Sequence, residues 1–197
     1  YCTLEPCCHH GKTGPCTEAI IKSGIKKVVI GIKDPNPKVS GSGIKQLENN
    51  DIEVLAGFFK EELIELNKHF FYKNTHKRPY IGVKIACSAD GMSHRKDYTF
   101  TWITSEKSRD DVQIVRAGFD AILTGGNTLR NDNPRMNARV NFEVNQPQKI
   151  LLTSKEINKE LNFFKNGGVI IKRSSDLTEV INELSASEIN SILVEAC

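Results

Sequence analysis

The chain has 197 residues, 27 of them basic and 24 acidic, which gives a formal net charge of +3. This length is enough for one large domain or two small ones, each with a buried core. No long run of one charge indicates a nucleic-acid or membrane tail, no apolar run approaches the roughly 20 residues of a membrane span, and the start has no signal-peptide pattern. We therefore expect a cytoplasmic protein with no nucleic-acid or membrane partner.

The first third of the chain alternates between helical and strand patterns. A short helix is predicted over 17–22 and a buried strand over 27–32, followed by a helix over 43–50 and a strand over 52–55. This order of elements is typical of a parallel α/β unit. An amphipathic helix over 60–71 is expected to close this domain by packing on its sheet.

A polar linker over 73–79 leads to a second alternating pattern. It starts with a strand over 80–86 and a helix over 105–117. Further strands are predicted over 121–124, 149–153, 168–172 and 192–194, with a helix over 177–184 that Asp176 can cap. The pattern predicts two α/β domains, over residues 1–76 and 79–197.

Two Pro-Cys pairs give the strongest chemical signal in the sequence. Cys7 and Cys16 each follow a proline, and Cys16 opens a predicted helix, whose positive end favours a thiolate. Two isolated cysteines are more often structural, but the prolines and the nearby histidines favour a zinc site. None of the five histidines belongs to a His-x-Glu tripeptide, which in zinc deaminases carries a ligand and the proton-shuttling glutamate. We expect that ligand and that catalytic glutamate to lie upstream of Tyr1, outside this chain.

Several residues of the second domain are of types that ligand sites use. Ala86 and Trp102 can form an apolar shelf that excludes water. Arg116 and Arg139 suit a phosphate, because a guanidinium matches its oxygens two at a time. Thr128 opens a short helix that can hydrogen-bond a phosphate. Taken singly, each of these residues is also typical of a turn, a core aromatic or a surface charge.

The motifs together resemble one known family. Thr3-Leu4-Glu5-Pro6-Cys7 followed by Pro15-Cys16 resembles the bifunctional deaminase–reductase of riboflavin biosynthesis, and the segments from Lys84-Ile85-Ala86 to Val194-Glu195-Ala196 resemble its reductase half. Eight residues separate the two cysteines, whereas nucleic-acid adenosine deaminases separate theirs by two. The resemblance implies the C-terminal part of a cytidine-deaminase-like α/β/α domain followed by a partial dihydrofolate-reductase-like α/β domain.

The resemblance also implies two cofactors, Zn²⁺ and NADPH, and a set of site residues. The zinc ligands would be Cys7 and Cys16. The residues that would contact NADPH are Ala86, Trp102, Thr128, Asp132 and Ser154. The residues that would contact substrate are Arg116, Met136, Arg139 and Glu195, with Phe100 and Lys12 as further candidates. Phe100 replaces a small polar residue that is usual in the family, and Cys197 replaces a glycine.

Two activities follow from the resemblance. The first is zinc-dependent hydrolytic deamination of 2,5-diamino-6-ribosylamino-4(3H)-pyrimidinone 5′-phosphate, and the second is NADPH-dependent reduction of the ribosyl group of the uracil product to ribityl. The partner would be this pyrimidine ribonucleotide phosphate, and we expect a homo-oligomer. Both ends look cut, so we expect this chain to have neither activity in full.

Two other interpretations remain open. One is a non-catalytic nucleotide-binding module with a structural zinc knot, in which the two cysteines would be joined by two of Cys2, Cys8, His9 and His10. The other is a nucleic-acid base deaminase, which the cysteine spacing and the absence of a basic stripe disfavour.

Overall fold

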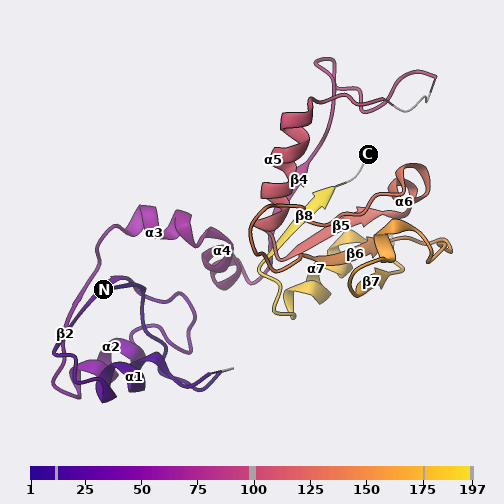
Figure 1. Ribbon diagram of the computed structural model, residues 1–197. Helices are drawn as coiled ribbons and strands as arrows, with labels where there is room; N and C mark the ends of the chain where they lie inside the picture. Colours follow the sequence, from indigo (N-terminus) through magenta and orange to yellow (C-terminus); the bar gives the residue numbers. More distant parts are fainter. Residues whose placement is uncertain (12, 98–100, 175, 196–197) are drawn as a thin grey trace. The chain divides into compact units, whose positions relative to one another are not determined.

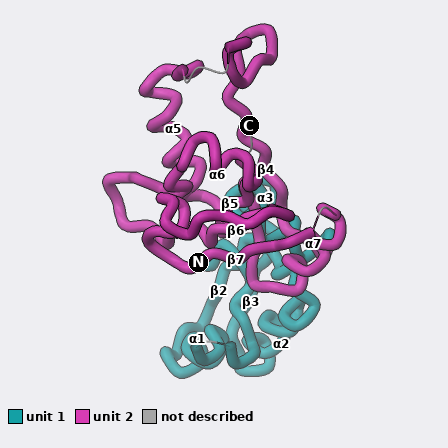
Figure 2. The backbone as a smooth tube through the Cα atoms, turned by 90° about the vertical axis from the view of Figure 1, so that its right-hand side faces the viewer, with its two compact units in different colours: residues 1–76 teal, residues 77–197 magenta. Residues whose placement is uncertain are grey.

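The computed structural model describes residues 1–11, 13–97, 101–174 and 176–195. The chain divides into two compact units, residues 1–76 and residues 77–197, which Figure 2 shows in different colours. Each unit contains a parallel β-sheet with helices between the strands. An α/β fold is therefore confirmed for both parts of the chain.

The first unit is built on a three-stranded parallel sheet in the order β1-β2-β3. The strands are β1 (Cys2–Leu4), β2 (Lys27–Ile32) and β3 (Glu53–Ala56). Helix α1 (Cys16–Lys22) connects the first two strands and α2 (Ser42–Glu48) the last two. The helices and strands predicted over 17–55 are confirmed to within two residues at each end.

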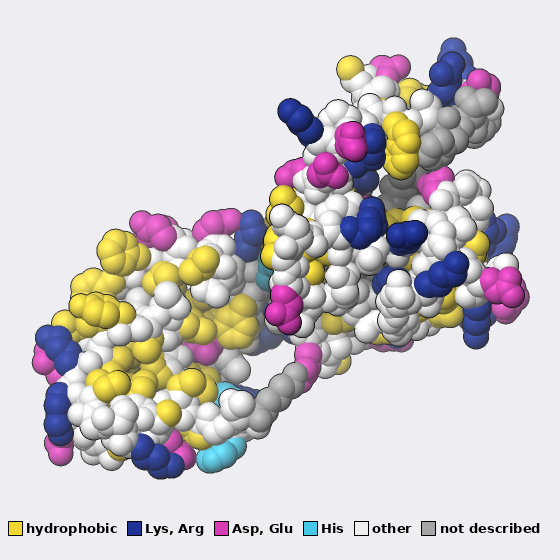
Figure 3. All heavy atoms as spheres, viewed as in Figure 1, with side chains coloured by type: hydrophobic (Ala, Val, Ile, Leu, Met, Phe, Trp, Pro, Cys, Tyr) yellow, Lys and Arg dark blue, Asp and Glu magenta, His cyan; other side chains and the backbone are white. Residues whose placement is uncertain are grey.

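A small apolar core lies between this sheet and its helices. Val28, Ile30, Leu47 and Ile52 are buried and pack together. Several large apolar side chains of the same unit are instead exposed, and Figure 3 shows hydrophobic side chains across much of the visible face of residues 1–76. Phe59 and Leu66 are 73% and 69% exposed. The described residues therefore cover the apolar surface of this unit only in part.

The helix predicted over 60–71 is in fact two helices, α3 (Lys60–Leu66) and α4 (Lys68–His76). They are separated by Asn67, whose φ of −117° and ψ of 28° are not helical. α4 also extends into the predicted linker, where the prediction is wrong. Its polar last turn is held by local contacts, since the Tyr72 and His76 rings stack with centroids 4.2 Å apart, and such pairs four residues apart stabilise a helix.

The second unit has a five-stranded parallel sheet in the order β4-β8-β5-β6-β7 (Figure 1). The strands are β4 (Tyr80–Lys84), β5 (Ala121–Gly125), β6 (Gln148–Leu152), β7 (Val169–Lys172) and β8 (Ser191–Glu195). The last strand in the sequence lies between β4 and β5. This insertion brings the end of the described chain beside the first strand of the unit.

Both faces of this sheet are covered. The connecting elements are α5 (Glu106–Ala117), α6 (Gly126–Asp132), the 3₁₀ helix η1 (Asn162–Phe164) and α7 (Leu177–Ser185). Because alternate residues of a strand point to opposite faces, the strands contribute to two cores, one that includes residues of α7 and one that includes residues of α6 and η1. Asp176 caps α7 as predicted, since its carboxylate accepts a hydrogen bond from Thr178 N at 2.8 Å.

Among the described residues, no helix has the length and apolar character that crossing a membrane requires.

Candidate functional site

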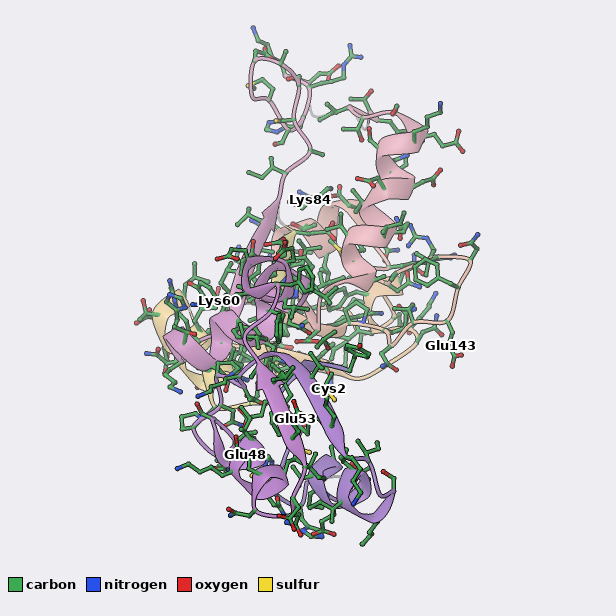
Figure 4. All side chains as sticks on the ribbon, turned by 90° about the vertical axis from the view of Figure 1, so that its left-hand side faces the viewer. Cys2, Glu48, Glu53, Lys60, Lys84 and Glu143 are labelled. Atoms are coloured by element: carbon green, nitrogen blue, oxygen red, sulfur yellow. The ribbon has the colours of Figure 1, made fainter. Side chains whose placement is uncertain are left out.

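Charged side chains meet at the carboxyl edge of the five-stranded sheet, where α/β proteins usually bind ligands. Lys84 and Glu195 end the neighbouring strands β4 and β8 and are paired in register. Figure 4 labels Lys84 at the end of β4. Its ammonium nitrogen lies 3.7 Å from Glu195 Oε2, which makes an ion pair but not a short hydrogen bond.

The centre of this site is a buried pair formed by Arg116 and Glu195. Arg116 Nε donates to Glu195 Oε1 at 2.6 Å, and Nη2 donates to Oε2 at 2.9 Å. The two residues are only 8% and 4% exposed. Two parallel charge-assisted hydrogen bonds fix the carboxylate in both position and orientation.

The remaining N–H groups of Arg116 are also used inside the protein. Nη1 donates to the side chain of Gln113 at 3.4 Å and to the backbone oxygen of Asn137 at 3.2 Å, while Nη2 approaches Met136 Sδ at 3.5 Å. A guanidinium has five donors, and these contacts account for all of them. Arg116 therefore has no free donor for a substrate phosphate, which differs from what its residue type suggested.

Arg139, in contrast to Arg116, has guanidinium N–H groups that no described residue accepts. Its Nη1 donates to Asn137 Oδ1 at 3.0 Å, whereas neither Nε nor Nη2 has a partner among the described residues. Burial, together with the charges of Arg116 and Arg135, lowers the pKa of Arg139, and Glu195 opposes this shift. Positive charges that disfavour one another in this way attract an anion.

The five residues predicted to contact NADPH follow the carboxyl ends of three strands. Ala86 and Trp102 lie between β4 and α5, Thr128 and Asp132 lie in α6 after β5, and Ser154 follows β6. Ala86 is half-buried, Thr128 is buried, and Asp132 and Ser154 are exposed. The Trp102 ring is 66% exposed, and the Arg109 guanidinium carbon lies 4.4 Å from its centroid. An exposed indole of this kind can stack on a planar ligand.

The end of β5 fits a nucleotide cofactor in two respects. Thr124 Oγ1 is buried without a hydrogen-bond partner among the described residues, and strand alternation places this side chain on the face that α6 covers. At the next residue, a Cβ added to Gly125 would meet no atom within 4 Å, so the backbone is open to a ligand. A Cβ on Gly126 would instead lie 2.5 Å from Thr153 Oγ1, so that glycine is needed for packing.

In the first unit, the two predicted zinc ligands lie side by side. Cys16 N donates to Cys7 Sγ at 3.4 Å. The pKa of the Cys16 thiol is raised, mainly by its side-chain hydrogen bond with Cys7 and by burial, with smaller effects from the charges of Cys7 and Cys2. This shift is opposite in direction to the effect expected of a helix N-terminus, because two adjacent thiols oppose each other's ionisation.

The two sulfurs suit a soft metal but are not a complete site. In the described part of the chain, no three Cys, His, Asp or Glu side chains are placed to hold one ion. A catalytic zinc uses three protein ligands and a structural zinc four. The structure thus supplies two donors for zinc and does not assemble the four-ligand knot that the alternative interpretation requires.

The catalytic glutamate of the deaminase reaction was expected upstream of Tyr1, and the structure does not test that expectation. Tyr1 itself is fully exposed, and β1 begins at the next residue, Cys2. Tyr1 therefore contributes no buried group to the cysteine site. The position and identity of the proton shuttle stay a prediction.

A buried carboxylate next to the cysteine loop was not identified from the sequence. Glu5 is 3% exposed and accepts hydrogen bonds from the backbone N–H groups of Asp34 at 3.2 Å, Gly41 at 2.9 Å and Ile44 at 3.1 Å. It therefore ties the segment before Cys7 to the start of α2. A lone acidic residue has no spacing pattern, so only its place in the motif could have indicated this role.

Two further substrate candidates, Lys12 and Phe100, lie outside the described residues. Sequence reasoning gave no role to Lys84 or Asn137; the position of Lys84 at a strand end was the available signal.

A cavity of about 430 Å³, lined by residues 117–120 and 143–146, contains none of the predicted site residues. Glu143, labelled in Figure 4, belongs to that cavity.

Comparisons with known proteins agree with the resemblance seen in the motifs. A family model described as the RibD C-terminal domain matches residues 79–197, more than half of the chain. The riboflavin biosynthesis protein RibD of Aquifex aeolicus is 37% identical over 219 residues, covering 99% of this chain and 62% of the relative. The RibD of Bacillus amyloliquefaciens is 44% identical over 155 residues, covering 79% of this chain and 42% of the relative.

Two solved structures are similar over almost the whole chain. Acinetobacter baumannii RibD has a TM-score of 0.91 and 33% identity, and the match covers 98% of this chain and 61% of that one. A diaminohydroxyphosphoribosylaminopyrimidine deaminase/5-amino-6-(5-phosphoribosylamino)uracil reductase from Thermotoga maritima has a TM-score of 0.84 and 37% identity, covering 98% and 60%. The chain spans at most 62% of the length of these four relatives. It belongs to the RibD family.

Proposed function

We propose that this chain serves riboflavin biosynthesis, and that residues 79–197 form a dihydrofolate-reductase-like domain that reduces the ribosyl group of 5-amino-6-(5-phosphoribosylamino)uracil. The observation that carries the proposal is the buried Arg116–Glu195 pair beside Lys84, at the carboxyl edge of a sheet that matches the RibD C-terminal family. NADPH, when bound, would supply the hydride. Ala86, Trp102, Thr128, Asp132 and Ser154 would hold it.

In this proposal Glu195 and Lys84 orient the sugar and its base. Arg116 holds the Glu195 carboxylate still, and from the described residues Oε1 accepts only one of the two hydrogen bonds that it can take. That free position can accept a ribose hydroxyl. The side chain of Lys84 is 29% exposed, and within the described residues its ammonium makes only the 3.7 Å ion pair with Glu195, so it can donate to a substrate oxygen.

Arg139 is the group that would take the substrate phosphate. Its free Nε and Nη2 donors match two phosphate oxygens, and a substrate held at the phosphate loses less freedom when the hydride is transferred. Met136 and Asn137 would position Arg116 and Arg139 rather than bind phosphate themselves.

The experiment is a binding comparison between the substrate and its dephosphorylated riboside. Charge-assisted hydrogen bonds contribute about 1.5–3 kcal/mol each, so Arg139→Ala should weaken binding of the phosphorylated form by about tenfold or more. Binding of the riboside should stay unchanged. The control is Arg173→Ala, which removes an exposed arginine paired with Glu156.

Either of two results would count against this assignment. An equal loss for both ligands would mean that Arg139 supports the fold and not the phosphate. A loss for Arg173→Ala as large as for Arg139→Ala would mean that only general positive charge matters. Titration with NADPH tests the cofactor separately, since Thr128→Val should weaken it without changing riboside binding.

We further propose that residues 1–76 are the C-terminal part of a cytidine-deaminase-like domain. Support comes from the motif at Cys7 and Cys16 and from the adjacency of these two residues. Zinc, when bound, would act as a Lewis acid that activates water for attack on the pyrimidine. A histidine ligand and a proton-shuttling glutamate would come from a segment upstream of Tyr1, so the chain alone would deaminate poorly or not at all.

Metal analysis tests this second proposal. Cobalt(II) titration should give weak thiolate charge-transfer absorption that Cys7→Ser and Cys16→Ser both abolish, while Cys87→Ser, at an exposed position, serves as the control. Stoichiometric, tightly held zinc with four protein ligands would instead indicate the structural knot. Tightly held zinc with ammonia release would show that the two cysteines need no ligand from elsewhere.

A further inference from the structure

A cavity on the second unit is lined by basic and amide side chains. Its volume is about 230 Å³, and its lining residues are Arg135, Asn137, Lys149, Asn162, Lys165 and Asn166. None of these is acidic. Lys149 is the second residue of β6 and pairs with Val169, the first residue of β7, so this cavity lies at the amino end of the sheet. Glu195, in contrast, lies at the carboxyl end of the sheet.

Lys149 is a buried cation with no counter-charge in the described part of the chain. It is 3% exposed, and its ammonium donates to the backbone oxygens of Phe163 at 2.7 Å and Lys165 at 2.9 Å. An ammonium has three N–H donors, and the third has no hydrogen-bond partner among the described residues, although the ammonium lies over the Phe163 ring, 5.5 Å from its centroid. Burial lowers the pKa of Lys149, and no neighbouring carboxylate opposes this effect. A buried charge is costly unless an opposite charge accompanies it.

The other two cations of the cavity also have no acidic partner among the residues that the structure describes. Arg135 is exposed and makes no hydrogen bond or ion pair within the described ranges. Lys165 Nζ donates to Asn162 Oδ1 at 3.0 Å, which is a neutral acceptor. Three positive charges therefore surround one space with only amide and carbonyl groups between them. An anion is the ligand that such a space favours.

We propose that this cavity binds a phosphate-type oxyanion. Small-molecule pockets commonly measure about 300–1,000 Å³, so the smaller volume here suits a single phosphate group and not a whole nucleotide. Lys149 supplies a desolvated point charge, and Arg135 can donate to two oxygens at once. The inference does not depend on the reductase assignment, because none of the cavity's cations belongs to the proposed substrate or NADPH site.

An anion bound in the cavity would still affect the carboxyl-edge site through one residue. Asn137 lines the cavity, its backbone oxygen accepts from Arg116, and its side-chain oxygen accepts from Arg139. An anion that orders Arg135 and Asn137 would therefore order the residue that positions both guanidinium groups. This contact gives the cavity a physical route to the phosphate-binding arginine.

The test is a titration of the whole chain with sodium phosphate at constant ionic strength, read by calorimetry and by the thermal unfolding of residues 77–197. Binding to the folded form alone should raise the unfolding temperature as phosphate increases. We expect saturable binding that Arg135→Ala combined with Lys165→Ala weakens at least tenfold. Both side chains are exposed, so this variant should fold, and Lys149→Met provides a second test at the buried position.

Two controls make the result specific. Lys159→Ala removes an exposed lysine from the same connection between β6 and β7 but outside the cavity, and it should bind phosphate like the unchanged chain. The proposal is overturned if chloride raises the unfolding temperature as much as phosphate does, or if Lys159→Ala weakens the binding as much as the double variant does.

A second titration with ribose 5-phosphate identifies the source of the phosphate. If the double variant weakens binding of inorganic phosphate and of ribose 5-phosphate alike, the cavity accepts the phosphate of a larger metabolite. If it weakens only inorganic phosphate, the cavity takes the free ion. Both outcomes support the site, and no change for either ligand refutes it.

Discussion

The buried Arg116–Glu195 pair gives a prediction that tests whether the two side chains stabilise the protein through each other or through separate contacts. Arg116→Met would leave the Glu195 carboxylate 4% exposed, with the ammonium of Lys84 at 3.7 Å as its remaining charged partner. Removing one member of a buried pair typically costs about 3–5 kcal/mol, because the other charge stays buried and uncompensated. Arg116→Met should lose roughly that much stability, as should Glu195→Leu.

The double variant should lose much less. When both members are replaced by apolar side chains of similar volume, neither desolvated charge remains, and such replacements are often close to neutral. Lys84 is 29% exposed and keeps access to water when Glu195 is absent. The free energy lost by the double variant should therefore fall short of the sum of the two single losses by at least about 3 kcal/mol.

The assay is urea unfolding of the four proteins, followed by amide hydrogen exchange at β5 and β8 so that only the second unit is measured. Similar slopes against urea would show that the variants unfold the same structure. Losses that simply add would refute the reasoning, since they would mean that each side chain contributes through separate contacts. Gln113→Ala, which removes a weaker partner at 3.4 Å, should cost only about 1 kcal/mol.

Three further predictions concern single residues. Glu5→Gln should destabilise the first unit by roughly 2–4 kcal/mol, because an amide cannot accept all three backbone N–H bonds, and hydrogen exchange in β2 should report the loss. Gly43→Ala should cost about 1–3 kcal/mol, since its Cβ would lie 2.1 Å from the backbone oxygen of Pro6, whereas Gly14→Ala, with open space around it, should cost almost nothing in the same measurement. The lowered pKa of Lys149 means that the unfolded chain binds more protons between the folded pKa and about 10.4, so stability should rise with pH in that window. Urea unfolding of Lys149→Met should lack this rise, and a wild-type stability that falls relative to the variant would contradict the assignment.

The order of helices and strands was readable from the sequence where apolar residues alternate clearly. The buried strands at Lys27–Ile32 and Ala121–Gly125 are runs of apolar residues bounded by polar ones, and their positions are confirmed. The break at Asn67 was not readable, because the apolar spacing continues across it. The last turn of α4 was missed for the opposite reason: its residues are polar, and ring stacking between Tyr72 and His76 stabilises it locally.

The pairing at the site could not be predicted from one sequence, because it depends on the order of strands in space. Arg116 and Glu195 are 79 residues apart, and they meet only because β8 inserts between β4 and β5. Chain order alone is equally compatible with β8 next to β7 at the other edge of the sheet, where Glu195 would not be paired in register with Lys84.

Tertiary structure also gives Arg116 and Arg139 different roles, although the sequence shows only that both are arginines. Arg116 is 8% exposed and its five donors are used inside the protein, whereas Arg139 is exposed and keeps Nε and Nη2 available within the described structure. A guanidinium that holds a carboxylate acts on the ligand through that carboxylate, and one with free donors can bind phosphate directly. Motif resemblance assigns both to the substrate; burial and hydrogen bonding indicate which of them can touch it.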